Sequence, residues 1–165
     1  MMTMREILFR GRHKVYYNYE TEQDVFKWVY GAYGNHTSFD AMIIDRPYLT
    51  SNSDLSALNF WVVDPATVGQ FTGLYDATKW EALSESEQEE WLETHTADEW
   101  KGRKIFEGDI VKIKHIDKFG VVEWQTLEAR YLVFTGGDWF TMDEWTYEVI
   151  GNIHDNPEML EVNNE

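Results

Sequence analysis

The sequence predicts a mainly β protein, in which an all-β scaffold carries one small helical insertion. Two observations predict the strands: apolar and polar residues alternate with a period of two, and glycine, proline or aspartate residues separate the short apolar runs. A third observation predicts the insertion, because between residues 78 and 100 the apolar spacing becomes helical and the composition becomes acidic.

The N-terminal part is expected to hold five or six strands. Arg5–Tyr19 reads as an extended pair interrupted at Gly11 and Arg12. The run at 25–30 is short enough to be ambiguous, and Gly31 and Gly34 are expected to end it. Asp64-Pro65 should end a later strand, since proline lacks the backbone N–H. Further strands and one polar loop are expected at these positions: strands at 41–45 (closed by Arg46-Pro47), 58–63 and 68–74, and the loop at 51–56.

Three Ser/Thr-x-x-Glu patterns mark the insertion. They are Thr78 with Glu81, Ser84 with Glu87, and Thr96 with Glu99. In this pattern the hydroxyl accepts from a backbone N–H at a helix start while the glutamate reaches back to the cap. The spacing therefore predicts two short helices and a third turn in an acidic segment.

After Gly102 the pattern returns to strands with short turns. A turn is expected at 117–120, and Gly136-Gly137-Asp138 predicts a tight hairpin because glycine readily adopts positive φ. Closely spaced strands of this kind suggest a small barrel. The expected strands are 109–116, 121–125, 130–135, 139–142 and 147–153. The predicted organisation is thus an N-terminal β subdomain at 1–76, the acidic helical insertion at 77–100, a C-terminal barrel at 101–160 and a frayed tail at 161–165.

The charge and the cysteine content narrow the classes of function. The 165 residues contain 14 Lys and Arg against 30 Asp and Glu, which gives a net charge of −16. This charge repels a phosphate backbone, so direct nucleic-acid binding is not expected despite a short basic patch at Arg10, Arg12, His13 and Lys14. Cysteine is absent and no apolar stretch could span a bilayer, so a cytoplasmic protein without membrane contact is expected.

Four stretches carry motifs in a fixed order along the chain. They are 4–10 (MREILFR), 68–76 (VGQFTGLYD), 101–111 (KGRKIFEGDIV) and 148–160 (EVIGNIHDNPEML). Together they resemble the YopX-like family of phage and prophage proteins. The resemblance implies a mostly β protein with an SH3-like barrel in its C-terminal half, and a phage or prophage origin. It brings no agreed catalytic residues, and the family usually joins the second and third stretches by only a few residues, without the acidic insertion.

The sequence offers little support for an enzyme. It lacks the nucleophile-elbow, phosphate-loop and dinucleotide-binding motifs, and its five histidines stand alone, so neither a cofactor nor a metal site is expected. Glu107-Gly108-Asp109 could suggest a carboxylate site. A turn is the better interpretation, since glycine supplies the bend and the carboxylates can accept from backbone N–H groups.

Eight tryptophans remain to be explained. Most of the four in predicted strands are expected in the core: Trp28, Trp61, Trp124 and Trp139. Trp80, Trp91 and Trp100 are harder to bury, so the insertion either docks onto the scaffold through them or presents them to a partner. These three tryptophans, with Glu87 and Glu90, are the predicted partner-binding residues, and docking is the favoured alternative for the tryptophans.

Two functional hypotheses follow. The first is a non-enzymatic accessory protein that acts as an oligomeric or partner-binding β module, with a host or phage protein as the partner. The second is an acidic inhibitor that binds a host DNA-binding protein by imitating phosphate charge, because the insertion concentrates glutamates. Salt separates them, since charge mimicry weakens steeply as salt rises whereas apolar docking does not.

Overall fold

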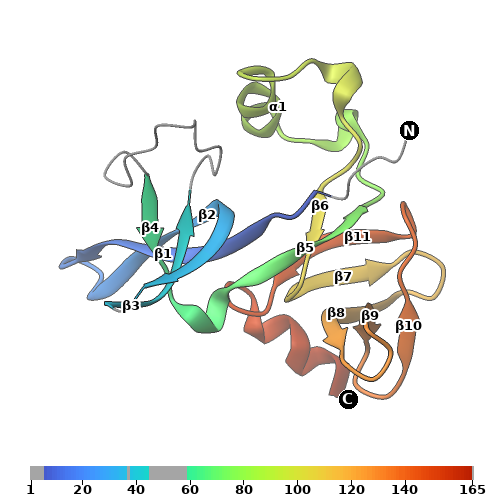
Figure 1. Ribbon diagram of the computed structural model, residues 1–165. Coiled ribbons are helices and arrows are strands. Elements are labelled where there is room, and N and C mark those ends of the chain that lie inside the picture. Colours follow the sequence, from blue (N-terminus) through green and yellow to red (C-terminus); the bar gives the residue numbers. More distant parts are fainter. Residues whose placement is uncertain (1–5, 37, 45–58, 165) are drawn as a thin grey trace. The chain divides into compact units, whose positions relative to one another are not determined.

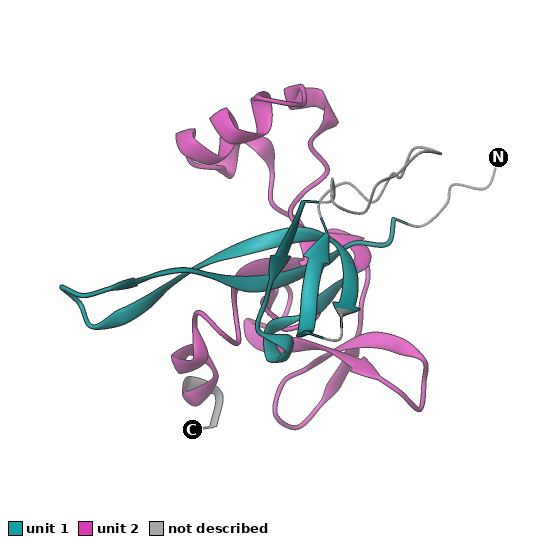
Figure 2. Cartoon of the chain, turned by 60° about the vertical axis from the view of Figure 1, so that its left-hand side comes forward, with its two compact units in different colours: residues 1–71 teal, residues 72–165 magenta. Residues whose placement is uncertain are grey.

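The computed structural model describes residues 6–36, 38–44 and 59–164. The chain divides into two compact units, residues 1–71 (unit 1) and 72–165 (unit 2), shown in two colours in Figure 2. Both units are built mainly of antiparallel strands, which confirms the predicted fold class. The finer division at 76 and 100 remains a prediction, and the expected loop at 51–56 and the Arg46-Pro47 stop lie outside the described residues.

Unit 1 is an antiparallel sheet in the order β4-β3-β2-β1-β5 (Figure 1). Its core is a small cluster of Val29, Ala41, Ile43 and Val63. Asp64 caps the turn η2 (Pro65–Thr67) through a hydrogen bond from the Ala66 N–H, as the proline stop predicts. The strands are β1 (Phe9–Asn18), β2 (Gln23–His36), β3 (Phe39–Ile44), β4 (Phe60–Val62) and β5 (Gly69–Tyr75), the last of which continues into unit 2.

Two sequence predictions for unit 1 are wrong for the same physical reason. β1 runs through Gly11 and Arg12 without a break, and β2 runs past Gly31 and Gly34. A Cβ on Gly31 would lie 2.1 Å from the carbonyl oxygen of Ile44, and one on Gly11 would lie 2.9 Å from the Val63 side chain. These glycines therefore permit close packing inside strands and do not form turns.

The insertion contains one α-helix, α1 (Glu85–Leu92), between two short 3₁₀ turns, η3 (Trp80–Ala82) and η4 (Ala97–Glu99). The predicted capping box at Ser84 and Glu87 is confirmed. The third Ser/Thr-x-x-Glu pattern, Thr96 with Glu99, is also confirmed, because the Glu99 carboxylate accepts from the Thr96 N–H at 2.7 Å. The first pattern is wrong: the Thr78 hydroxyl instead donates to Asp76, 2.7 Å away, and no side chain caps η3.

The sheet of unit 2 has the order β10-β9-β8-β7-β11. The hairpin at Gly136 is confirmed by the Thr135 N–H, which donates to the Asp138 carbonyl at 3.0 Å. The turn predicted at 117–120 lies three residues earlier, because β8 already begins at Lys118. The remaining elements are β6 (Lys104–Phe106), β7 (Asp109–Ile113), β8 (Lys118–Gln125), β9 (Arg130–Phe134), β10 (Trp139–Thr141), β11 (Tyr147–Asn152) and the 3₁₀ segment η5 (Pro157–Asn164).

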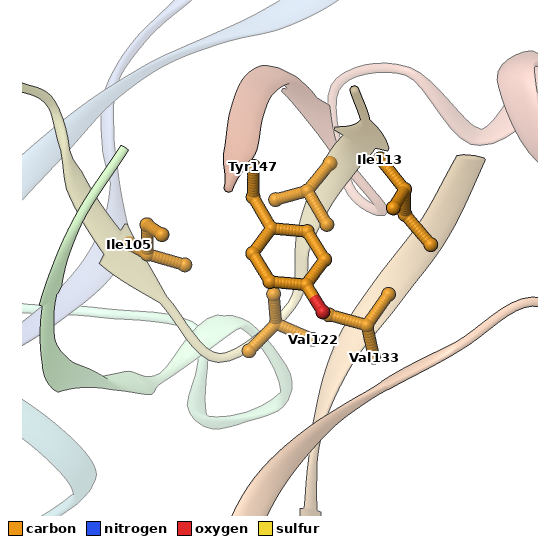
Figure 3. Close-up of a cluster of buried hydrophobic side chains, with 6 residues drawn as sticks. Ile105, Ile113, Val122, Val133 and Tyr147 are labelled. Atoms are coloured by element: carbon orange, nitrogen blue, oxygen red, sulfur yellow. The ribbon is translucent and has the colours of Figure 1, made fainter. Parts of the chain in front are cut away.

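The core of unit 2 lies on one face of this sheet, where Tyr147 is surrounded by branched aliphatic side chains (Figure 3). Its buried members are Ile105, Val111, Ile113, Val122, Val133 and Tyr147. Among the described strands, no pairing joins β10 to β11, so closure into an SH3-like barrel remains a prediction.

The prediction that most strand tryptophans form the core is wrong. Trp124 and Trp139 are exposed, and Trp28 and Trp61 are only half-buried. Trp124 pairs with Tyr131 across the sheet and Trp139 with Phe134, with ring centroids 5.0 and 4.6 Å apart. Each ring contacts an aromatic neighbour on the adjacent strand, edge to face for Trp124 and tilted for Trp139, and leaves its other side to solvent.

Among the described residues, the helices are all too short or too polar to span a lipid bilayer.

Candidate functional site

One buried carboxylate organises the base of the insertion. Asp76 is fully buried, and its Oδ1 accepts from the N–H groups of Thr78 (2.9 Å) and Arg103 (2.7 Å). Its Oδ2 accepts from the Thr78 hydroxyl (2.7 Å) and from the Val149 N–H (3.0 Å). Asp76 therefore ties together the segment that enters the insertion, the segment that leaves it, and β11.

The two ends of the insertion run next to each other at this base. The Asp76 N–H donates to the Arg103 carbonyl at 2.9 Å. Gly102 lies between them with φ +114°, and a Cβ at this position would lie 2.3 Å from the Asp76 carbonyl oxygen. Only glycine combines this backbone conformation with such a close approach.

A second contact ties α1 to this base. The Arg103 guanidinium donates to the Thr78 hydroxyl at 3.2 Å and forms a 2.7 Å ion pair with Glu87. Hydrogen bonds from Arg103 and then from Ser84 lower the pKa of Glu87 to about 2. Glu87 is thus both an N-terminal cap of α1 and its tether to the segment that precedes β6.

Trp80, Trp91 and Trp100 pack together, and we call them the tryptophan cluster. Trp100 meets the other two edge to face, with ring centroids 6.2 Å from Trp80 and 5.0 Å from Trp91. The Trp91 indole N–H donates to the Thr96 carbonyl and that of Trp100 to the Thr78 carbonyl, both at 2.9 Å. All three rings are half-buried, so the insertion builds its own aromatic core.

An open cleft of about 430 Å³ adjoins this cluster within unit 2. Its walls include three aromatic and three cationic side chains: Trp80, Trp100, Trp145, Lys79, Lys101 and Lys114. Glu81 is the one carboxylate among the described lining residues. A chain of net charge −16 thus concentrates three of its lysines around one aromatic cleft.

Trp145 occupies an unusual position at this cleft. It lies in the turn between β10 and β11 with φ +59°, a left-handed conformation that bulky residues rarely adopt. Its backbone N–H donates to the Tyr75 carbonyl and its indole N–H to the Lys101 carbonyl, both at 3.2 Å. The side chain is nevertheless 62% exposed. Two hydrogen bonds therefore hold an exposed ring in a strained conformation.

A second exposed apolar surface lies in unit 1, on the hairpin of β1 and β2. The two strands pair as far as Asn18 and Gln23, whereas β2 pairs with β3 only from Ala32 onward. The outer hairpin is therefore a two-stranded ribbon, which buries little on its own. The exposed apolar side chains of the whole β1–β2 hairpin, which we call the hairpin surface, are Val15, Tyr16, Tyr17, Tyr19, Phe26 and Tyr30.

The structure brings together some of the predicted site residues and separates others. The three insertion tryptophans meet, but Glu87 faces Arg103 and Glu90 is exposed on α1. Their role in partner binding remains a prediction. Sequence reasoning missed Trp145 and Lys114, which reach the cleft from other segments. Trp145 follows Asp143-Glu144 and lies outside every apolar run. A tryptophan isolated among acidic residues is the one sequence feature that could have marked it as an exposed site residue.

The Glu107-Gly108-Asp109 motif forms the predicted turn. Asp109 is buried and its carboxylate accepts from the Phe106 N–H at 2.7 Å, while Gly108 has φ +85°. In the described ranges, no group of three histidine, aspartate or glutamate side chains is placed to hold a metal ion.

Comparison with protein-family profiles gives a match. Residues 84–161 match the profile of the protein family described as YopX protein. The match covers just under half of the chain and includes α1 as well as β6 to β11. Most of the insertion, residues 84–100, therefore lies inside the matched region, which corrects the expectation that the family lacks it. The motif stretches at 4–10 and 68–76 fall outside it, and their resemblance remains an expectation. The search of curated proteins found no match to the chain.

Proposed function

Residues 84–161 form a YopX-like domain, and from this premise we propose that the protein is a non-enzymatic accessory module that assembles with further copies of itself through the hairpin surface. One observation carries the proposal: a chain of net charge −16 exposes six apolar side chains on the single hairpin of β1 and β2. Apolar patches of this kind on charged proteins mark interaction sites, and closed homo-oligomers are the commonest assemblies.

The assignment to a binding module also rests on what the buried carboxylates do. Asp76 lies in the motif stretch 68–76 and Asp109 in the stretch 101–111. Both are buried, and both accept hydrogen bonds from backbone N–H groups inside unit 2. This use supports a structural role for them rather than a role in acid or base chemistry.

Sedimentation velocity of the full chain tests the assembly. We expect a mass that is a multiple of 19.5 kDa for the wild type, and the monomer mass for the double variant Tyr16→Ser/Tyr17→Ser. The matched control is Leu127→Ser, which removes an apolar side chain that is 94% exposed in unit 2 and should leave the mass unchanged. A monomeric wild type at about 100 µM, a concentration at which micromolar interfaces are occupied, would refute the proposal.

Exposed carboxylates on α1 support a second candidate, the acidic inhibitor of a DNA-binding protein. Glu85, Glu89 and Glu90 are exposed on this helix, whereas Glu87 and Glu99 are engaged in capping. A complex with a bacterial DNA-binding protein should dissociate as sodium chloride rises past about 0.15 M, where the Debye length is near 8 Å. A host complex that survives higher salt would exclude charge mimicry.

A further inference from the structure

We propose that the cleft of unit 2 binds a mononucleotide, with the base stacked on the exposed ring of Trp145 and the phosphate on the lysines. The proposal concerns a site separate from the hairpin surface and does not depend on the proposed function. The juxtaposition of Trp80, Trp100 and Trp145 with Lys79, Lys101 and Lys114 carries it. The volume of about 430 Å³ is in the range of small-ligand sites.

The aromatic walls are fixed before any ligand arrives. The indole N–H of Trp100 donates to the Thr78 carbonyl, and that of Trp145 donates to the Lys101 carbonyl. Because backbone carbonyls satisfy their polar edges, these rings offer only their faces and carbon edges to a ligand. Stacking on such a preset ring costs little ordering and suits any flat aromatic base.

The cations of the cleft are available for a ligand. Lys79 and Lys114 make no ion pair with any residue that the structure describes, while Lys101 approaches only the Tyr75 ring, at 5.8 Å. Other lysines of the chain do pair, as Lys112 does with Asp117 at 2.8 Å. Three ammonium groups without a carboxylate partner favour a compact anion such as phosphate.

The remaining charge of the molecule limits the size of the ligand. A net charge of −16 repels a long polyanion over its whole length, but charges beyond the Debye length of about 8 Å are largely screened from a small anion in the cleft. A mononucleotide therefore fits better than a nucleic-acid strand. Glu81 lines the same cleft and can accept from the N–H groups on the edge of a guanine base.

The strained backbone of Trp145 is a second, independent observation. A bulky residue at φ +59° persists only where the surroundings hold it, and such outliers cluster at functional sites. Two hydrogen bonds hold this ring at the cleft while most of its surface faces solvent. A ligand stacked on the ring would cover that surface.

Isothermal titration calorimetry of the full chain with guanosine 5′-monophosphate tests the proposal. We expect saturable binding, with guanosine (base without phosphate) and inorganic phosphate (phosphate without base) each at least about tenfold weaker, since both halves of the site contribute. Failure of the monophosphate to bind at about 1 mM, or equal binding of guanosine or phosphate alone, would overturn the proposal.

Two variants test the location. Trp145→Ala and Lys114→Gln should each weaken binding by about fivefold or more, as expected for loss of a stacked ring or a charged hydrogen bond. The matched controls are Trp124→Ala and Lys118→Gln, an exposed tryptophan and a lysine of the same unit outside the cleft. Circular dichroism confirms that each variant is folded. Wild-type affinity in both cleft variants, or an equal loss in the controls, would refute the site.

Discussion

Asp76 shows how one buried carboxylate can organise a junction between distant segments. Its four hydrogen bonds come from residues 78, 103 and 149, so the contacts span more than 70 positions of sequence. A charged acceptor that satisfies several buried N–H groups contributes more than a neutral one. The junction in turn places Gly102 against the Asp76 carbonyl and Arg103 against α1.

Replacing Gly102 should destabilise this junction. Gly102→Ala forces a Cβ into a left-handed backbone position 2.3 Å from the Asp76 carbonyl, so we expect a loss of about 2 kcal/mol or more in the free energy of unfolding, measured with urea. Gly137→Ala is the control, because a Cβ there meets nothing within 4 Å. Equal stability of the two variants would contradict the close approach.

The pKa of Glu87 predicts an acid-dependent loss of stability. Its folded-state pKa of about 2 lies below the ordinary value of 4.5, so the Arg103 contact stabilises the fold above about pH 5 and is lost as pH falls toward 2. The side chain is 41% exposed, which limits the contribution to about 0.5–1 kcal/mol.

Urea unfolding of Glu87→Gln between pH 7 and pH 3 measures this contribution. The variant should be less stable than the wild type at pH 7, and the difference should shrink as the pH falls. Glu90→Gln, an exposed change on the same helix, should follow the wild type at every pH. A constant difference across this range would contradict the assignment.

At the scale of elements, α1 is too short to be stable by itself. Helices shorter than about 12 residues are marginal in water, and α1 has eight residues and none of them is buried. Its stability therefore depends on the Ser84 cap, on the Glu87–Arg103 pair and on the Trp91 contact with Trp100. Each of these contacts can be removed singly.

Removal of the cap should loosen the helix. Ser84→Ala deletes the hydroxyl that accepts from the Glu87 N–H, and we expect a cost of about 1 kcal/mol. Hydrogen exchange of the amides in residues 85–95 should accelerate several-fold, while exchange in β7 and β8 stays unchanged. Glu90→Ala, an exposed change inside the helix, is the control and should leave exchange in α1 unchanged or slower, since alanine favours helix. Unchanged exchange in Ser84→Ala would mean that the cap contributes nothing.

Stops, turns and caps that depend on neighbouring residues were predictable from the sequence, apart from the Thr78 pattern, whose hydroxyl donates to Asp76. The Asp64-Pro65 stop, the Gly136 hairpin and the Ser84 capping box depend on local chemistry and were correct. The role of Gly31 is not visible in its neighbours, because it depends on Ile44, which lies beside it only in the sheet. The cleft was missed for the same reason, since Trp145 and Lys114 reach Trp80 only through the fold.

At the scale of the whole molecule, the charge of −16 opposes the folded state, because folding brings like charges closer together. Added salt screens this repulsion. We expect the free energy of unfolding to rise by about 1 kcal/mol between about 20 and 300 mM sodium chloride. The triple variant Glu89→Gln/Glu90→Gln/Glu93→Gln should show a smaller increase. A decrease with salt would mean that surface ion pairs such as Lys14–Asp24 outweigh the repulsion.

The two ends of the insertion lie side by side, so the segment between them can be replaced by another sequence. The chain leaves the scaffold at Asp76 and returns at Arg103, and the hydrogen bonds that join these two residues use no atom of residues 79–99. Closing a longer loop across fixed ends costs only about 0.6 kcal/mol for each doubling of its length. Gene-level replacement of residues 79–99 could therefore give one scaffold many recognition elements, and the same junction offers engineers a place to graft a foreign helix.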